Sequence, residues 1–231
     1  MNVETKMVSA GALPAFEARP AGAARLPAVL VIQEAFGLNA HIKDVARRIA
    51  AEGYVALAPD LYWRGGPGRS VRYDQLPEAI ALMQSLQDDE IVADVAAAIT
   101  YLERHPGVRA DRIGITGFCM GGRVSYLAAC ALPGKIKACV PFYGGGIPVE
   151  RTPSLTAPVL AFFGEEDGFI PPENVQALRA ALTKHGKQAE VIVYPKAGHG
   201  FFCDERASYH ADSARDAWAR ATTFLARHLQ A

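Results

Sequence analysis

The stretch IGITGFCMGG, residues 113–122, decides the fold. Its first half is short, apolar and β-branched, as in a buried strand, and the apolar segment 120–131 predicts a helix. The junction has the pattern G-x-C-x-G, with Cys119 between Gly117 and Gly121. A strand-to-helix turn this sharp strains its central residue and requires small residues two positions before and two after it. The pattern therefore predicts a nucleophile turn that carries Cys119.

The predicted position of Cys119 favours a reactive thiolate. Unpaired N–H groups and the dipole at a helix N-terminus stabilise negative charge and lower the pKa of a thiol. The N–H of Met120 would supply half of an oxyanion hole. Because glycines flank small residues by chance in many such turns, the pattern alone is weak. A catalytic role of Cys119 requires an acid and a histidine at the ends of later strands.

Strands and helices alternate on both sides of this turn. Short aliphatic runs predict buried parallel strands at 28–32, 54–58, 113–117, 138–143, 159–163 and 190–194. Amphipathic segments predict helices at 39–51 with Asn39 as N-cap, in two pieces across 75–104, and at 120–131, 172–185 and 208–228. An antiparallel edge hairpin is expected around 2–8 and 12–18. The alternation predicts an α/β fold, a mostly parallel central sheet with helices on both faces.

An acid and a histidine follow the cysteine at later strand ends. Three adjacent carboxylates follow residue 163, of which Asp167 is favoured and Glu165 and Glu166 are expected to be solvated. His199 lies in a glycine-rich loop after residue 194. The order nucleophile, acid, histidine is that of the α/β-hydrolase arrangement. The remaining histidines fall on predicted helices or their ends and are expected to be solvated or to cap helices: His41, His105, His185, His210 and His228.

The composition excludes several classes of protein. The 231 residues are 50% apolar and carry 24 basic and 24 acidic side chains, which predicts one globular domain over residues 1–231. A net charge of zero argues against nucleic-acid and acidic-membrane partners, which require a positive field. The first residues lack a basic segment followed by an apolar one, and the run 28–32 is too short to span a bilayer. A cytoplasmic protein is expected.

The four cysteines contain no C-x-x-C pair and predict no disulfide framework. Cys130, Cys139 and Cys203 are expected to be buried packing residues. His199 and Cys203 are spaced as metal ligands only on a helix, and the glycines and phenylalanines around them offer no further ligand. We expect neither a metal nor another cofactor.

The sequence resembles the dienelactone hydrolases, the carboxymethylenebutenolidase family of the α/β-hydrolase fold. The resemblance runs through nearly the whole chain and is carried by VIQEAFGLN (31–39), ALAPDLYWR (56–64), GITGFCMGG (114–122), FFGEEDGFIP (162–171) and YPKAGHGF (194–201). It implies a Cys119, Asp167 and His199 triad. It also places the family's characteristic glutamate on Glu34 and its second oxyanion amide on Ala35.

The resemblance implies two-step acyl transfer. Cys119 attacks a lactone or ester carbonyl, the amides of Ala35 and Met120 hold the oxyanion, and His199 oriented by Asp167 activates water against the thioester. The family's prototype reaction opens carboxymethylenebutenolide to maleylacetate. In the family the glutamate contacts the resting cysteine and helps to form the thiolate, although a carboxylate after a buried strand can instead serve only as a structural ion pair.

The residues that would bind substrate follow the family pattern less closely. Dienelactone hydrolases hold the substrate carboxylate with two arginines, and neither position is securely matched by Arg64, Arg69, Arg72 or Arg206. Arg206 lies seven residues after His199, more than in the family. Phe36, Trp63 and Phe201 are further candidates for the pocket. The substrate is expected to be a small ester or lactone, and the protein a monomer or small homo-oligomer.

Other functions remain open from the sequence. A carboxylesterase or thioesterase of broad specificity would share every catalytic residue and differ only in its pocket. A redox-active thiol at Cys119 would leave Asp167 and His199 unexplained, with Cys203 as a possible resolving thiol. A binding protein on a hydrolase scaffold is disfavoured by the intact triad.

Overall fold

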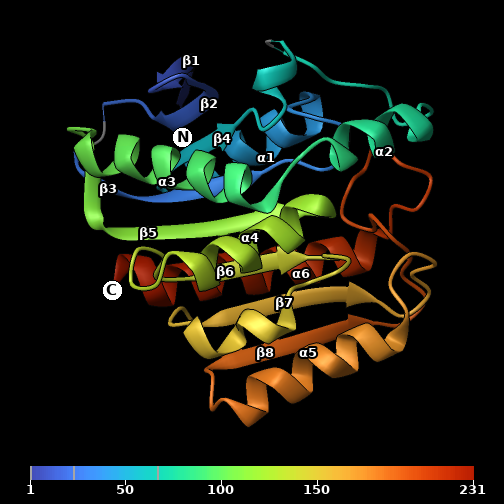
Figure 1. Ribbon diagram of the computed structural model, residues 1–231. Helices are drawn as coiled ribbons and strands as arrows, with labels where there is room; N and C mark the ends of the chain where they lie inside the picture. The colour runs from blue at the N-terminus through green and yellow to red at the C-terminus, as the bar shows by residue number, and fades with distance from the viewer. Residues whose placement is uncertain (1, 23, 67) are drawn as a thin grey trace.

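The computed structural model describes residues 2–22, 24–66 and 68–231. Its eight strands form one sheet in the order β1-β2-β4-β3-β5-β6-β7-β8 (Figure 1). The strands span Val3–Ala10 (β1), Leu13–Pro20 (β2), Leu26–Ile32 (β3), Val55–Pro59 (β4), Val108–Phe118 (β5), Cys139–Phe142 (β6), Val159–Gly164 (β7) and Ala189–Tyr194 (β8). The strands β4, β3, β5, β6, β7 and β8 pair in parallel, whereas β1 and β2 form an antiparallel hairpin at the edge. The predicted mostly parallel sheet and its edge hairpin are confirmed.

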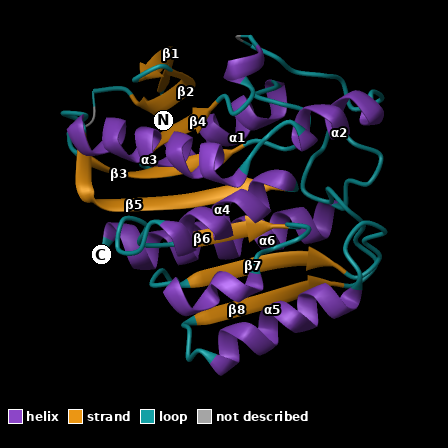
Figure 2. Ribbon diagram, viewed as in Figure 1, coloured by secondary structure: helices purple, strands orange, loops and turns teal. Residues whose placement is uncertain are grey.

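Helices lie on both faces of the sheet (Figure 2). They span Ala40–Ala51 (α1), Leu76–Gln84 (α2), Asp88–Arg104 (α3), Met120–Ala131 (α4), Pro172–Lys184 (α5) and Ala211–Leu225 (α6), with short 3-10 turns at Trp63–Gly65 (η1) and Val149–Ser154 (η2). In the view of Figure 1, α3 and α4 lie in front of the sheet and α1 and α6 behind it. Each helix can thereby bury its apolar side against the strands. The predicted α1 and its Asn39 cap are confirmed, since the Asn39 side chain accepts a hydrogen bond from the N–H of Ile42.

Strand β5 and the last helix differ most in extent from the prediction. β5 begins at Val108, five residues before the predicted start. Val108 pairs with Leu26 of β3, and the register shifts between this pair and the next, Ile113 with Ala28. The predicted last helix, 208–228, begins at Ala211 and ends in a π-helical turn, Ala226–Gln230 (η3). Helix periodicity in the sequence does not reveal such changes at element ends.

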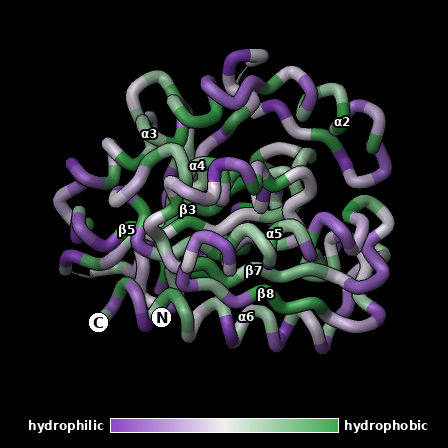
Figure 3. Tube along the Cα trace, turned by 60° about the horizontal axis from the view of Figure 1, so that its bottom comes forward, coloured by the Kyte–Doolittle hydropathy of each residue, from purple (hydrophilic) through white to green (hydrophobic). Residues whose placement is uncertain are grey.

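Burial decreases from the middle of the sheet toward β8. β4 and most of β3 are fully buried, whereas β8 begins with two exposed residues and has a single buried one, Tyr194. Figure 3 shows hydrophobic residues along the strands and hydrophilic ones on the outer turns. The carboxyl ends of β3, β5, β7 and β8 meet at one edge of the sheet, where a site in a parallel sheet is expected. Among the described residues, no helix combines the length and apolar character needed to cross a membrane.

Candidate active site

Cys119 lies in a strained turn between β5 and α4. Its backbone has φ 56° and ψ −118°, and it is one of three non-glycine residues with positive φ in the described chain. Its N–H donates to the carbonyl of Phe142, 3.1 Å away, which ties the turn to β6. A side chain at Gly117 would meet the Gly121 carbonyl, and one at Gly121 would meet the Ile32 carbonyl. The two glycines thus allow the backbone to pass through the turn that presents Cys119.

The helix that follows places unpaired N–H groups beside this cysteine. Cys119 is the N-cap residue of α4 and Met120 is its first helical residue, so the Met120 N–H has no acceptor within the helix. The Cys119 side chain is partly exposed, whereas Cys130, Cys139 and Cys203 are buried. The expected burial of these three thiols is confirmed. Cys119 is the thiol best placed to meet a substrate.

His199 lies between Asp167 and Cys119. Its Nδ1 is 2.8 Å from Oδ2 of Asp167, whose other oxygen accepts hydrogen bonds from the N–H groups of Phe169 and Ile170. The Asp167 side chain is fully buried, and its hydrogen bonds fix the direction in which it points. As expected, Glu165 and Glu166 are exposed.

The surroundings of His199 favour its protonated form. Burial by itself lowers the pKa of the imidazole, but hydrogen bonds to Asp167 and Cys119, together with their charges, raise the pKa to about 9. The rings of Phe169 and Tyr143 pack edge-on against it with centroids 5.1 and 5.2 Å away. At neutral pH a positive imidazole therefore lies next to the sulfur, which is the arrangement that stabilises a thiolate.

The segment after β3 lies beside the start of α4. The buried Tyr62 hydroxyl donates to the carbonyl of Ala35 at 2.8 Å and lies 3.7 Å from the Met120 sulfur. Burial raises the pKa of Tyr62 and keeps it a hydrogen-bond donor. Tyr62 thus links the two residues whose amides were predicted to form the oxyanion hole.

Glu34 is completely buried behind these residues. Its Oε1 is 3.5 Å from a guanidinium nitrogen of Arg206, and its Oε2 accepts a hydrogen bond of 3.1 Å from the Tyr73 hydroxyl. The Arg206 guanidinium in turn packs on the rings of Phe36 and Tyr73, 5.5 and 5.7 Å from their centroids. A buried carboxylate is thereby compensated by a cation and a hydrogen bond, as its burial requires.

A cavity of about 530 Å³ opens over the thiol and the imidazole. Cys119, Met120 and Ala35 line it on the side of the turn, and Phe169 and Ile170 line it from the loop that follows β7. The largest group in the remaining lining is aliphatic and comes from α2, the start of α3 and the segment between them: Leu76, Ile80, Met83, Leu86 and Ile91. Such a cavity suits an apolar substrate with its carbonyl carbon over the sulfur.

The structure separates the candidate pocket residues into two groups. Phe36 and Arg206 line the cavity. Trp63 and Phe201, both described, are not among the lining residues, so their expected place in the pocket is wrong. The Trp63 indole lies against the carboxylate of Asp94, and Phe201 is fully buried beneath Tyr143 and Tyr194.

The other candidate arginines lie away from this cavity. Arg64 forms an ion pair of 2.6 Å with Asp94, and Arg72 forms one of 3.0 Å with Asp74. Arg69 lines a separate cleft beside the outer side of α2. Of the four arginines considered from the sequence, Arg206 alone is in the described lining.

Two charged residues that were not predicted from the sequence lie at the cavity. Arg123 and Asp88 both line it, and they form a two-pronged ion pair of 2.7 and 2.9 Å that joins α4 to the start of α3. Arg123 lies four residues after Cys119, one helical turn away, and that spacing was a signal available in the sequence. The distant partner Asp88 had no such signal.

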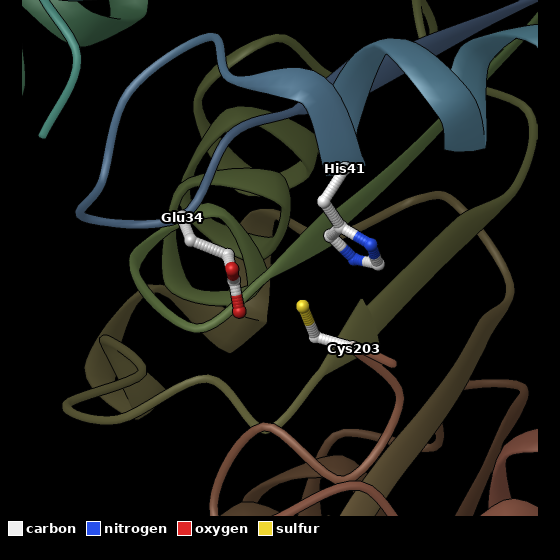
Figure 4. Close-up of side chains that lie close together, drawn as sticks. All are labelled: Glu34, His41 and Cys203. Atoms are coloured by element: carbon white, nitrogen blue, oxygen red, sulfur yellow. The ribbon is translucent and has the colours of Figure 1, made fainter. Parts of the chain in front are cut away.

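The surroundings of His41 differ from those predicted. It was expected to be solvated or to cap a helix, but it is 2% exposed and packs against the rings of Phe118 and Phe202. One ring nitrogen faces the space between Glu34 and Cys203 (Figure 4). The expectation of a capping histidine fits His210, which accepts a hydrogen bond from the Ser213 N–H.

Comparisons with known proteins show which family the chain resembles. The dienelactone hydrolase family matches residues 13–229. A Synechocystis protein provisionally named carboxymethylenebutenolidase is 42% identical over 217 residues, covering 88% of this chain and 87% of the relative. A Salmonella typhimurium protein of the same provisional name is 40% identical over 228 residues, covering 94% and 83%. The crystal structure of a provisionally named dienelactone hydrolase from Klebsiella pneumoniae has a TM-score of 0.90 at 38% identity and covers 98% of this chain and 100% of that one. From its strand order, its nucleophile turn and these matches over almost its whole length, the chain belongs to the dienelactone hydrolase family, and it is a hydrolase with the α/β-hydrolase fold.

Proposed function

We propose that this enzyme hydrolyses an enol lactone or activated ester through a Cys119, His199 and Asp167 triad and a thioester acyl-enzyme. The observation that carries the proposal is the position of His199, which lies 2.8 Å from the buried Asp167 carboxylate and lines the same cavity as Cys119, whose charge contributes to its raised pKa. A thiolate beside a protonated imidazole is an activated nucleophile at neutral pH.

In the first step the Cys119 thiolate attacks the substrate carbonyl carbon. The carbonyl oxygen becomes an oxyanion, for which the N–H groups of Ala35 and Met120 are the proposed donors. The carbon–oxygen bond to the ring or leaving alcohol then breaks, and His199 donates its proton to that oxygen. In the second step neutral His199 removes a proton from water, which attacks the thioester and releases the acid and the thiolate.

The nucleophile favours activated substrates. A thiolate is itself a good leaving group, so a tetrahedral adduct on an ordinary amide tends to revert. Enolates, phenolates and thiolates leave readily enough to compete with it. Enol lactones, aryl esters and thioesters are therefore the proposed substrate classes, rather than peptides.

The aliphatic lining favours a second candidate, a carboxylesterase or thioesterase acting on apolar acyl groups. Arg123 is held by Asp88, and Arg206 is shared with Glu34, so each guanidinium in the lining already has a carboxylate partner. A substrate carboxylate would have to compete with Glu34 for Arg206. Both candidates use the same triad and differ in the charge of the preferred substrate.

A panel of substrates separates these candidates. Carboxylated enol lactones, neutral p-nitrophenyl esters and acyl-CoA thioesters would be assayed with the wild type, Cys119→Ala and Cys119→Ser. The proposal expects loss of turnover in Cys119→Ala and a strong loss in Cys119→Ser. Full turnover by Cys119→Ser would refute a role for the thiol, and reductant dependence without ester turnover would favour a redox function.

The proposed role of Glu34 requires its own test. Glu34→Gln keeps the size of the buried side chain and removes its charge. We expect slower acylation, measured as the burst of p-nitrophenol in rapid mixing, with little change in the unfolding midpoint. An unchanged acylation rate would remove Glu34 from the mechanism.

The cytoplasmic location and the oligomeric state stay predictions of the sequence.

A further inference from the structure

Three buried side chains with metal-binding atoms converge beside the active site. Glu34 follows β3, His41 lies in the first turn of α1, and Cys203 lies in the loop that carries His199. One ligand atom from each lies within 4.8 Å of those of the other two (Figure 4). All three residues are at most 2% exposed. Glu34 and His41 are seven residues apart, but Cys203 lies 162 positions after His41, so only the fold brings the three side chains together.

The His41 imidazole has an unused nitrogen in this cluster. Its Nε2 is buried without a hydrogen-bond partner, which is unusual for a polar atom inside a protein. Its Nδ1 lies 3.9 Å from a carboxylate oxygen of Asp204. Histidines that ligate metals commonly have a carboxylate near the second ring nitrogen, which orients the ring. Nε2 is then the nitrogen left to face the sulfur and the carboxylate.

The donor set matches a thiophilic divalent cation. Zinc is bound in proteins by cysteine sulfur, histidine nitrogen and carboxylate oxygen. The Tyr73 hydroxyl, which accepts from the Cys203 thiol at 3.2 Å and donates to Glu34 at 3.1 Å, adds an oxygen between two of the ligands. Ligands about 2.0 to 2.3 Å from one zinc ion lie roughly 3.5 Å apart, so the side chains need to draw together by about 1 Å.

We propose that Glu34, His41 and Cys203 form a binding site for a divalent cation of the zinc class. Binding forms bonds from the cation to the Cys203 sulfur, the His41 nitrogen and a Glu34 oxygen, and the thiol proton passes to solvent. The two anionic ligands neutralise the charge of the ion. Glu34 turns away from Arg206, whose guanidinium keeps its contacts with the rings of Phe36 and Tyr73.

The site would couple metal binding to turnover. Glu34 directly precedes Ala35, whose amide belongs to the proposed oxyanion hole, and Cys203 and His199 share one loop. A cation that fixes Glu34 and this loop should slow the hydrolase. This consequence rests on the proposed function, whereas the binding itself does not.

Cobalt(II) spectroscopy on the full chain tests the binding. The Cys119→Ala variant is used, because it removes the reactive thiol as a competing ligand. We expect one equivalent of Co²⁺ to give a thiolate-to-cobalt absorption in the near ultraviolet and tetrahedral bands in the visible, both abolished by adding Zn²⁺. The absorption should be lost in Cys119→Ala/Cys203→Ser. In Cys119→Ala/His41→Ala the affinity for Co²⁺ should fall at least tenfold.

The matched control is Cys119→Ala/Cys130→Ser, which replaces another buried thiol and should keep the full spectrum. Circular dichroism checks that each variant is folded. Absence of the absorption in folded Cys119→Ala, or its survival in Cys119→Ala/Cys203→Ser, would overturn the site. These spectra need no substrate, so they remain decisive even if the enzyme turns over no ester.

Inhibition is tested separately with wild-type enzyme and zinc. We expect the zinc concentration for half inhibition of ester turnover to rise at least tenfold in His41→Ala. An equal sensitivity of the wild type and this variant would assign the inhibition to Cys119 and His199 and overturn the proposed coupling.

Discussion

At the scale of single residues, the four thiols differ in their surroundings. Cys119 is partly exposed at the cavity and beside an imidazole with a raised pKa. Burial raises the pKa of Cys130 and of Cys203 to about 12, and it also raises the pKa of Cys139. Because the thiolate is the reacting form, reactivity should be concentrated at Cys119.

Alkylation checks this difference. Iodoacetamide at neutral pH should modify Cys119 fast and the three buried thiols only after denaturation, as followed by mass spectrometry of tryptic peptides. Loss of ester turnover should follow the modification of Cys119. Alkylation of Cys203 in the folded protein at the rate of Cys119 would contradict the predicted ranking.

His199 should make stability depend on pH. Its pKa is about 9 in the folded enzyme and 6.5 by ordinary value, so the folded state binds the proton more tightly. The stabilisation is complete below pH 6.5, declines as the pH rises and is lost above 9, with an upper bound of about 3 kcal/mol. Urea unfolding of the wild type and His199→Gln at pH 6, 7.5 and 9 measures it. The excess stability of the wild type should shrink with rising pH, and a constant difference would contradict the raised pKa.

At the scale of elements, the turn between β5 and α4 depends on two glycines. The Cβ of an alanine at position 117 would lie against the Gly121 carbonyl and 2.6 Å from the Ser125 hydroxyl oxygen. These neighbours belong to the packed start of α4 and cannot easily move. The turn is therefore a place where a single methyl group forces a shift of the helix.

Gly117→Ala should lower the free energy of unfolding by about 1 to 3 kcal/mol, the usual cost of overpacking, and should reduce turnover because Cys119 moves with the turn. Gly168→Ala is the matched control, since a Cβ there meets no atom within 4 Å. Urea unfolding followed by circular dichroism compares the two. Equal stability of both variants would show that the turn tolerates the added methyl group.

At the scale of the whole molecule, the cavity is assembled from segments that are distant in the chain. Helix α2 contributes its Ile80 side to the cavity, while Leu82 lines the cleft on its other side. The length of acyl chain that the enzyme accepts should therefore depend on one side of α2.

Ile80→Gln should raise KM for a p-nitrophenyl hexanoate several-fold and change that for the acetate little, because only the longer chain reaches the aliphatic lining. Leu82→Gln, on the same helix but outside this cavity, should leave the ratio of the two KM values unchanged. An equal rise in KM for both esters in Ile80→Gln would show that the acyl chain binds elsewhere.

The sequence by itself determined the architecture and predicted the three segments of the proposed triad. Strand and helix periodicity act over a few residues, so the sheet, its flanking helices and the Asn39 cap were readable without coordinates. The turn at Cys119 could be predicted as well, because its local sterics require small residues at positions 117 and 121, where Gly117 and Gly121 lie. The order of cysteine, acid and histidine then placed each segment at a strand end.

Only the tertiary structure decided which side chains surround the proposed triad. Cys203 meets Tyr73 across 130 positions of sequence and Arg206 meets Glu34 across 172, contacts that no local pattern encodes. Trp63 was misplaced for the same reason, since its partner Asp94 lies in another helix. Local preferences fix where a strand or a turn stands, but a buried charge or ring must find its partner wherever the packing of the whole chain brings one.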